Sequence, residues 1–351
     1  MRTLQSCLLA SVAVFGGFAA QAADLPAKQA TPAADVVRSC PAHGAGFFTI
    51  PGSETCLKLG GYLRYIGTYN DPNNSATTAQ YAQSARFRLE VDARSNTEFG
   101  VLRGFSRMND ASLSRAFVQL GAFTAGRYGN SSDISGTYSE NYSSLLSNST
   151  ESIGVKYEAK LGPVSAFVAI ENAFDNNASS AISDRPDAVL GFSTKLDPVD
   201  LKLNAISHQV QTATDTAEGY AVIGSARAKV DAVGFALYGG ISKGALLYTG
   251  RPSSSYTDSA TDATGLSDGT NIGAELTYTM GPGTLALTVG QITAERSTGA
   301  KTTLNRYGAA YGYNIAKDLI IMPELMITET DVKGSASTYA NIAYVTIKRT
   351  F

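Results

Sequence analysis

The sequence predicts an all-β protein, specifically a 16-stranded antiparallel transmembrane β-barrel with short periplasmic turns and long extracellular loops. Three observations support this prediction: an export leader, strands whose side chains alternate between apolar and polar, and connections that alternate between short and long. The chain has 351 residues, of which 44% are hydrophobic and 17% are charged. Its 34 glycines, 18 tyrosines and 11 prolines favour strands and tight turns over helices.

The charge of the chain is low and almost balanced. There are 28 Lys and Arg residues against 30 Asp and Glu residues, which gives a formal net charge of −2 at pH 7. A protein that binds nucleic acid through its phosphates normally carries a basic excess. We therefore expect no nucleic-acid partner.

Residues 1–22 have the features of a secretory signal peptide. Arg2 provides a positive start, Cys7–Ala20 forms an apolar stretch, and the residues at 20–22 match an A-x-A cleavage site. The mature chain is expected to begin at Ala23. Beyond the cleavage site, no apolar run reaches the length of about 18 residues that a membrane-spanning helix needs. A membrane would therefore have to be crossed by a closed barrel.

Two cysteines, Cys40 and Cys56, remain after the leader is removed, and they are 16 positions apart. Paired cysteines in an exported protein are usually oxidised, which predicts a disulfide within a periplasmic N-terminal segment, residues 23–56. A disulfide that closes a loop of this length stabilises by about 3 kcal/mol in the chain-entropy model. The alternative is that both cysteines bind a metal ion together with His43.

Strand-like alternation recurs along residues 57–351, where we place the barrel. Within residues 84–94 the odd positions are apolar and the even positions are polar or charged. The same kind of pattern occurs at residues 152–160, 200–204 and 345–351. Because successive side chains of a strand point to opposite faces, each segment has one apolar and one polar face.

The connections between the strands are of two kinds. Seven are short turns, at Arg94–Thr97, Gly121, Leu161–Pro163, Asp197–Pro198, Asp231–Gly234, Gly281–Gly283 and Ala316–Asp318. Eight are longer stretches rich in Ser, Thr, Asn, Asp and Gly, at Asp71–Gln80, Asn109–Ala111, Asn130–Thr150, Phe174–Pro186, Gln211–Glu218, Lys243–Thr270, Arg296–Thr303 and Lys333–Ser337. Seven turns and eight loops join 16 strands. The alternative is a pair of tandem β-sandwiches.

Four segments resemble the alphaproteobacterial outer-membrane porin family of the rhizobial type. They are Ala23–Pro26, Cys40–Gly61, Gly121–Gly129 and Tyr344–Phe351. The resemblance implies a homotrimeric general-diffusion porin in the bacterial outer membrane, with a water-filled channel for small hydrophilic solutes and ions. It also implies contact with outer-membrane lipid and lipopolysaccharide, no cofactor, and a C-terminal Phe351 that is read by the barrel assembly machinery.

Three arginines are candidates for the polar wall of the channel. Arg64 on the first strand and Arg86 and Arg88 on the second strand fall on polar faces near mid-height. A barrel of this size leaves an aqueous lumen, and rings of charge at its narrowest point set its selectivity. We therefore expect these arginines at the constriction. The alternative is that Arg86 and Arg88 are simply solvated residues of the wall, or form ordinary ion pairs there with Glu90 and Asp92.

In the porins that this chain resembles, the third loop folds into the barrel and narrows it. By count this loop is residues 130–150, and its carboxylates Asp133 and Glu140, followed by Glu151, are expected to face the arginines. Opposite charges across the bore would create a transverse field that favours hydrated, dipolar solutes.

The alternation blurs between Gly100 and Leu120. One interpretation is that Gly100–Gly126 faces a neighbouring subunit of the trimer, where lipid-compatible side chains are not needed. The other is that the strand register differs from the one assumed here.

An enzyme is not expected from this sequence. Only two histidines, His43 and His208, are present, and there is neither a G-x-S-x-G nucleophile elbow nor a glycine-rich phosphate loop. Asp258, Asp262 and Asp268 do not have the spacing of an EF-hand, so no metal site is expected.

A solute-selective channel of the sugar-porin kind is the alternative to general diffusion. Such a channel needs tyrosines in succession along the lumen. Tyr62 is the only strong candidate on the polar faces of the early strands, which favours general diffusion.

Overall fold

The computed structural model describes residues 37–71, 80–134, 137–141, 151–172, 185–211, 216–253, 255–258 and 265–351. The expected signal peptide, residues 1–22, and the expected mature start at Ala23 lie outside these ranges.

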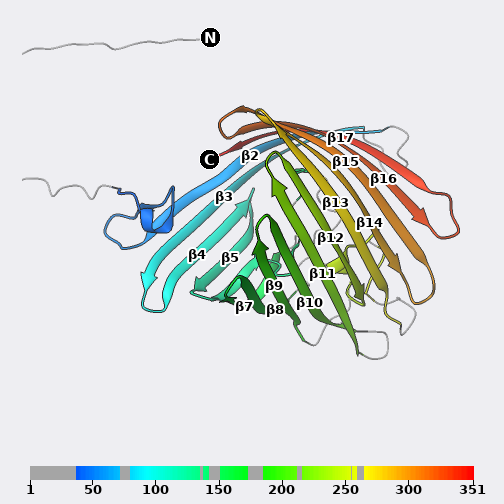
Figure 1. The fold of residues 1–351 in the computed structure, drawn as a ribbon, viewed down its shortest axis with the longest axis horizontal. Coiled ribbons are helices and arrows are strands. Elements are labelled where there is room, and N and C mark those ends of the chain that lie inside the picture. The colour runs from blue at the N-terminus through cyan, green and yellow to red at the C-terminus, as the bar shows by residue number, and fades with distance from the viewer. Residues whose placement is uncertain are drawn as a thin grey trace, which may run out of the picture. The chain divides into compact units, whose positions relative to one another are not determined.

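In the described part of the chain, 16 antiparallel strands, β2 to β17, form a closed barrel (Figure 1). Each strand pairs with its neighbours in the chain, and β17 pairs with β2, where Lys348 lies opposite Arg64. The predicted fold class is confirmed. The strands are β2 (Cys56–Asn70), β3 (Tyr81–Thr97), β4 (Gly100–Asn109), β5 (Ser112–Leu120), β6 (Phe123–Gly129), β7 (Glu151–Leu161), β8 (Val164–Asn172), β9 (Asp187–Leu196), β10 (Val199–Gln211), β11 (Thr216–Val230), β12 (Val233–Lys243), β13 (Asp268–Met280), β14 (Gly283–Glu295), β15 (Lys301–Ala316), β16 (Leu319–Val332) and β17 (Thr338–Thr350).

One rim of the barrel, the turn rim, carries only two-residue connections. They lie at residues 98–99, 121–122, 162–163, 197–198, 231–232, 281–282 and 317–318. The first differs from the prediction, because Arg94–Thr97 continues β3, with Ser95 opposite Leu102 and Thr97 opposite Gly100. The polar side chains of this segment belong to a strand end rather than to a turn.

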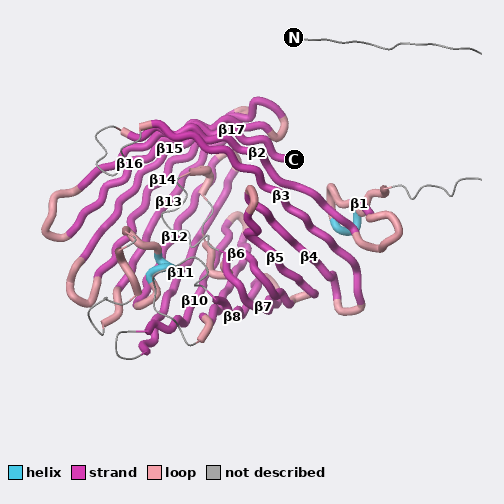
Figure 2. The backbone as a smooth tube through the Cα atoms, turned by 180° about the vertical axis from the view of Figure 1, so that it is seen from behind, coloured by secondary structure: helices cyan, strands magenta, loops and turns pink. Residues whose placement is uncertain are grey.

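The opposite rim, the loop rim, carries the longer connections. The connection between β12 and β13 includes a single-turn helix, α1 (Leu246–Thr249), which contacts β11, β12 and β13 (Figure 2). The predicted loop at Asn109–Ala111 is shorter than expected and spans only residues 110–111.

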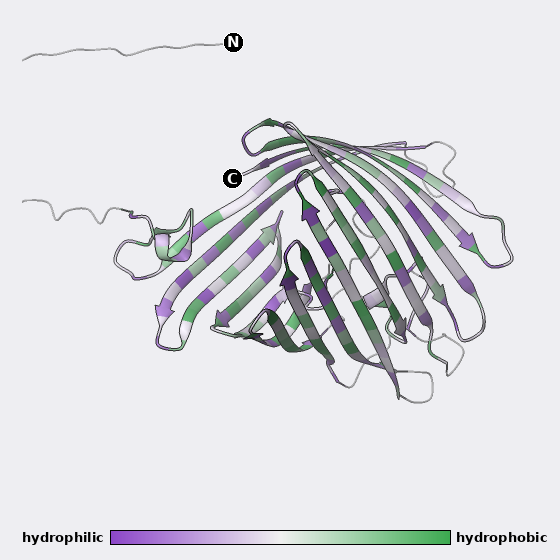
Figure 3. Ribbon diagram, in the orientation of Figure 1, coloured by the Kyte–Doolittle hydropathy of each residue, from purple (hydrophilic) through white to green (hydrophobic). Residues whose placement is uncertain are grey.

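The two faces of the wall differ in polarity, as the alternating colours along the strands in Figure 3 show. Leu59 and Leu63 of β2 are 50% and 55% exposed on the outer surface, whereas Tyr62 and Arg64 point into the barrel. An apolar outer band around a polar interior is typical of outer-membrane barrels. Among the described residues, no helix has the length and apolar character needed to cross a membrane.

The blurred alternation between Gly100 and Leu120 has a structural cause. The register of β4 and β5 shifts between Arg107 and Met108, so that Arg107 lies opposite Arg115 while Met108 lies opposite Leu113. Ser114 is therefore an extra residue, and it reverses which positions of β5 face inward. A single period of two cannot describe a strand that contains such a bulge.

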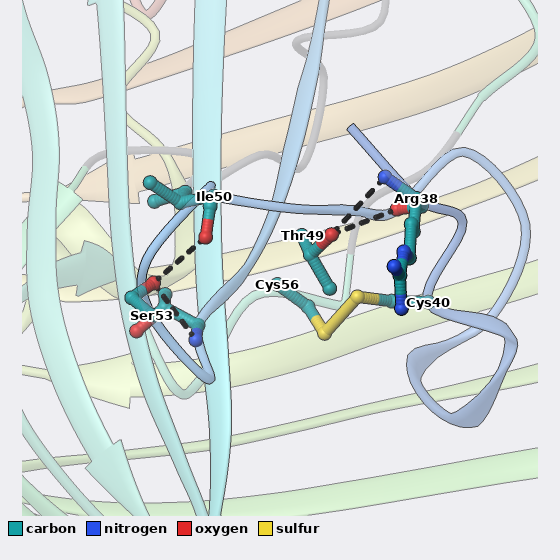
Figure 4. The surroundings of a disulfide bond; sticks show 7 residues. Arg38, Cys40, Thr49, Ile50, Ser53 and Cys56 are labelled. Atoms are coloured by element: carbon teal, nitrogen blue, oxygen red, sulfur yellow. Dashed lines mark hydrogen bonds between the residues drawn. A yellow bond between two sulfur atoms is a disulfide. The ribbon is translucent and has the colours of Figure 1, made fainter. Parts of the chain in front are cut away.

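A small disulfide-bonded segment precedes the barrel. Cys40 and Cys56 are joined, as predicted (Figure 4). The segment contains a short 3-10 helix, η1 (Pro41–His43), and a two-residue strand, β1 (Phe48–Thr49), which pairs with the first residues of β2. Figure 4 also shows the Arg38 N–H donating to Thr49 Oγ1 at 3.1 Å.

Phe47 attaches this segment to the wall. Its side chain is 5% exposed and packs with the disulfide. The Arg94 guanidinium of β3 lies 4.7 Å from the centre of the Phe47 ring, and the Lys58 ammonium of β2 lies 5.8 Å from it. The first barrel strand, expected to begin at Leu57, begins at Cys56, so the disulfide links the segment directly to the barrel.

We expect the double variant Cys40→Ser, Cys56→Ser to loosen residues 37–55 and to leave the barrel folded. The disulfide closes a loop that lies outside the barrel ladder, so its loss, about 3 kcal/mol in the chain-entropy model, acts on this segment. Limited proteolysis checks this, because cleavage should become faster within residues 37–55 while heat-modifiable migration on gels stays the same. Unfolding of the whole barrel would contradict the expectation.

Candidate constriction site

The loop between β6 and β7, described at residues 130–134 and 137–141, follows the inner wall of the barrel. Successive residues of the loop bond to successive strands. The bonds are Asn130 Nδ2 to Ser152 Oγ (3.0 Å), Ser131 N to Glu171 Oε1 (3.1 Å), Asn204 Nδ2 to Ser132 O (3.1 Å), Arg227 Nη2 to Ile134 O (2.7 Å), Tyr138 N to Glu275 Oε2 (2.9 Å) and Glu140 N to Glu324 Oε1 (2.9 Å). The loop thus lies inside the barrel and runs from β7 to β16.

Three buried carboxylates of the wall hold the backbone of this loop. Glu171, Glu275 and Glu324 are 0%, 5% and 1% exposed, and each accepts at least one loop N–H. Hydrogen bonds to a charged acceptor are stronger than neutral ones. The sequence analysis missed these residues, although a glutamate at an inward position of a strand otherwise lined by small and apolar residues is an available signal.

Glu324 makes the densest of these contacts. It accepts hydrogen bonds from the Ser139 hydroxyl, from the Glu140 N–H at 2.9 Å and from the Asn141 N–H at 3.3 Å. The Asn141 side-chain amide also donates to it. This carboxylate therefore fixes the part of the loop that carries Glu140.

Glu140 meets two cations on the far side of the loop. Arg64 Nη1 lies 3.1 Å from Glu140 Oε2, and the Lys348 ammonium contacts Glu140 Oε1. The Arg64 and Glu140 side chains are 12% and 20% exposed. The structure thus brings together Arg64 and Glu140, both expected at the constriction, and adds Lys348, which the sequence analysis did not select.

Arg86 and Arg88 have partners at the loop rim of β4. Arg88 Nε donates to Asn109 Oδ1 at 2.8 Å. Arg86 Nε lies 3.6 Å from Asp110 Oδ2, and both side chains are about half exposed. Neither arginine contacts Glu140 through an ion pair among the described residues.

The alternative pairing of these arginines with Glu90 and Asp92 does not occur. Arg107 of β4 pairs with Glu90 at 2.8 Å. Arg94 and Arg103 both pair with Asp92, at 2.8 and 2.9 Å. Glu90 and Asp92 therefore form their ion pairs with other arginines of the same wall.

Asp133 and Glu151 lie near a different arginine from the ones expected. Arg115 Nε lies 3.3 Å from Glu151 Oε1, and Asp133 is within electrostatic range of the same guanidinium. The Asp133 N–H donates to Asn130 O at 3.1 Å, which closes a turn at the start of the loop. Of the two loop carboxylates, Glu140 therefore lies with Arg64, and Asp133 lies with Arg115.

The middle of the inner face from β8 to β15 is packed by protein. Ile134 of the loop joins a buried cluster with Ile206, Tyr238 and Leu304 of the wall and Tyr248 of α1. On the opposite wall, by contrast, Arg86, Arg94 and Arg103 keep 45%, 27% and 26% of their side-chain surface exposed. Near the turn rim, however, the inward Lys195 of β9 and Asp200 of β10 are 76% and 53% exposed, so solvent reaches the inner wall on both sides.

A cluster of buried polar side chains holds the connection between β12 and β13, which contains α1, against the barrel wall. Asp187 Oδ1 lies 2.6 Å from His208 Nδ1, and the Tyr248 hydroxyl donates to Asp187 Oδ2. The Leu246 N–H donates to Asp258 Oδ1 at 2.6 Å. Burial raises the pKa of the Asp258 carboxyl and raises that of the Tyr248 hydroxyl well above its usual value.

These histidine and carboxylate groups do not form a metal site. Among the described residues, no group of three or more His, Cys, Asp or Glu side chains is arranged to hold a metal ion. Of the aspartates considered in the sequence, Asp258 belongs to the buried cluster and Asp268 begins β13, while Asp262 lies outside the described residues.

The C-terminus closes the seam of the barrel. The Phe351 N–H donates to Gly61 O at 3.1 Å, and the Gly61 N–H donates to Phe351 O at the same distance. Gly61 has φ of 154°, and a Cβ there would lie 1.9 Å from the Arg88 carbonyl oxygen. Only glycine therefore fits at this crossing of β2, β3 and the chain end.

A closed barrel with an apolar outer band and a loop seated in its interior defines a channel-type β-barrel of the outer membrane. A family model described as "Porin subfamily" matches residues 24–350. The chain belongs to this porin subfamily, and it is a multi-pass β-barrel of the bacterial outer membrane.

Known proteins similar to this chain include porins and other outer-membrane proteins. Porin Omp2b of Brucella suis biovar 1 (strain 1330) is 40% identical over 139 residues, which is 39% of this chain and 37% of that protein. The match thus spans little more than a third of the length of such curated relatives.

Two solved structures have the same fold at low sequence identity. The outer membrane channel DcaP of Acinetobacter baumannii is 15% identical with a TM-score of 0.74, over 86% of this chain and 98% of that one. OmpT of Vibrio cholerae, in its trimer form, is 14% identical with a TM-score of 0.62, over 85% of this chain and 100% of that one.

We expect Glu324→Gln to loosen residues 139–141 and increase the noise of the open channel. The substitution replaces one acceptor oxygen by a donor facing loop N–H groups, and each buried donor left without a partner costs about 1–3 kcal/mol. Single-channel current recording checks this. Glu329→Gln is the matched control, because Glu329 lies on the same strand and bonds to Asn305 and Tyr339 rather than to the loop. Equal noise in the two variants would contradict the role of Glu324.

Proposed function

We propose that this protein is a general-diffusion porin that forms a water-filled channel for passive passage of small hydrophilic solutes and ions across the bacterial outer membrane. The observation that carries the proposal is the loop seated along the inner wall, opposite a row of partly exposed arginines. Such an arrangement narrows a barrel and leaves one charged side open to water. No catalytic step and no cofactor is part of the proposal.

We assign the constriction to Arg64, Arg86, Arg88, Asp133 and Glu140. The Arg64–Glu140 ion pair joins the loop to β2, so it holds one side of the narrowed region. Arg86 and Arg88 line the neighbouring strand, and Asp133 lies near Arg115 at the other end of the described loop.

The solute-selective alternative, a channel of the sugar type, receives less support. Sugars bind to open aromatic faces, whereas the aromatic rings of this wall lie against cations. Arg88 lies 4.7 Å from the centre of the Tyr62 ring, and Arg103 lies 5.0 and 5.3 Å from those of Phe105 and Phe117. These faces are therefore not free to stack on a sugar.

The proposed assembly is a homotrimer in contact with outer-membrane lipid and lipopolysaccharide. The trimer form of OmpT has the same fold. The region Gly100–Gly126 is the proposed contact face between subunits, because β4, β5 and β6 are short strands of 10, 9 and 7 residues. We also propose that residues 1–22 are a signal peptide and that the barrel assembly machinery reads the exposed Phe351.

In the proposed orientation the turn rim and the segment 23–56 face the periplasm. The barrel, residues 57–351, then opens its loop rim to the outside, and the loop 130–150 narrows the bore from within. Short periplasmic turns and longer external loops are the rule for barrels of this class.

The purified mature protein should form large, ohmic channels in a planar bilayer, and raised voltage should close them in three equal steps. The expectation follows from an open lumen in each of three subunits. A silent membrane, or a small conductance blocked by one sugar, would overturn the general-diffusion proposal.

The double variant Arg86→Ala, Arg88→Ala should shift the zero-current potential in a salt gradient toward cation preference. Both substitutions remove positive charge from the channel wall, and the field at a constriction sets the relative entry of ions. If the potential does not move, these two arginines do not belong to the constriction.

A further inference from the structure

We infer that the channel prefers anions, and that Arg88, Arg64 and Lys348 around the Tyr62 ring form its subsite for the oxyanion group of small solutes that carry a phosphate or a carboxylate. The inference rests on the proposed channel function and specifies its substrate class.

The three cations converge on one ring from three adjacent strands. Arg88 Cζ lies 4.7 Å, Arg64 Cζ 5.6 Å and Lys348 Nζ 5.9 Å from the centre of the Tyr62 ring. The sheet register brings them together, since Lys348 of β17 lies opposite Arg64 of β2, and Tyr62 lies opposite Arg88 of β3.

The carboxylates near the Tyr62 ring do not balance the positive charge of the three cations around it. Glu140 pairs with both Arg64 and Lys348. Arg88 bonds to the neutral amide of Asn109 and forms no ion pair among the described residues. The part of the loop outside the described residues, 142–150, contains no Asp or Glu. Of the three cations, Arg64 and Lys348 thus share one carboxylate, and Arg88 has, within the described residues, only the longer-range attraction of Glu90, which itself pairs with Arg107.

Like charges that face each other across strands are unfavourable. Lys348 lies opposite Arg64, and Arg64 lies opposite Arg86, so three cations occupy one row across β17, β2 and β3. Glu140 and Asp110 offset part of this repulsion, and a bound anion would offset more of it, whereas a cation would add to it.

The donors needed to hold an oxyanion are available. Arg88 uses its Nε for Asn109, which leaves both Nη groups to a ligand. The Nε–H of Arg64 has no partner among the described residues. Guanidinium groups bind phosphate and carboxylate through paired N–H donors, which favours these groups over spherical anions.

The excess of positive over negative side chains continues along the wall toward the turn rim. Arg94 and Arg103 share the single carboxylate of Asp92. An anion that passes this part of the wall therefore meets more positive than negative side chains, although the chain as a whole has a net charge of −2. Local potential rather than net charge governs the entry of ions into a narrow bore.

The test is the zero-current potential of single channels in a gradient of potassium chloride, followed by titration with inorganic phosphate. The wild-type potential should have the sign of chloride preference, and phosphate should reduce the chloride current. Arg88→Gln and Lys348→Gln should each move the potential toward cation preference and weaken the phosphate effect roughly tenfold, as expected for loss of a charged hydrogen bond. Arg349→Gln is the charge-matched control, because Arg349 lies on the same outer face of β17 as the exposed Val345 and Ile347 and pairs with Asp318 at a turn.

Arg88→Lys separates charge from donor geometry. It should keep the chloride preference but weaken the phosphate effect, because an ammonium lacks the paired donors. A cation-selective wild-type channel would overturn the inference, and so would a phosphate effect equal in Arg88→Gln, Lys348→Gln and Arg349→Gln. A membrane without current would instead count against the channel function itself, so the two failures are distinguishable.

Discussion

The pairing of β17 with β2 is the constraint on which the rest of the structure depends. A lipid bilayer offers no water to satisfy backbone N–H and C=O groups, so a sheet can cross it only when its two edges pair with each other. Here the ladder from Ile342 to Thr350 along β17 makes that pairing, and the Phe351 backbone extends it to Gly61. Closure gives all strands one shared interior, and it is the reason that Lys348 and Arg64 reach Glu140 together.

Within that interior the two halves of the wall have different chemistry. In the middle of the wall from β8 to β15 the inward side chains are small, apolar or engaged in buried hydrogen bonds, and they pack against α1 and against Ile134. From β2 to β5 they are arginines with partial access to solvent. Wall carboxylates hold the backbone of the loop between β6 and β7, and the loop side chains Glu140 and Ile134 make further contacts with the wall, so the position of the loop depends on both.

The strands and most turns could be predicted because each depends on a local pattern: alternation with a period of two, and Gly, Pro or Asp at a tight connection. The pattern failed at the bulge at Ser114 and at the polar strand end Arg94–Thr97. Both features depend on how the strand pairs with its neighbour, and the local sequence does not contain that information. Of the two ion-pair partners of Glu140, only one was predicted from the sequence. Arg64 carries a signal as a lone arginine on a strand, but Lys348 is 208 positions from Glu140, and only barrel closure brings the two together.

The partners of the loop are distributed over most of the barrel, including both strands of the seam. Its hydrogen bonds go to β7, β8, β10, β11, β13 and β16, and its ion pairs go to β2 and β17. A nascent sheet with an open seam lacks some of these strands in their final places, so the loop can reach its complete set of contacts only after the first and last strands have met. The contacts to β7–β16 do not involve the seam, whereas the joint contact of Glu140 with Arg64 and Lys348 requires β2 and β17 to be paired, so this ion-pair cluster distinguishes a closed barrel from an open sheet.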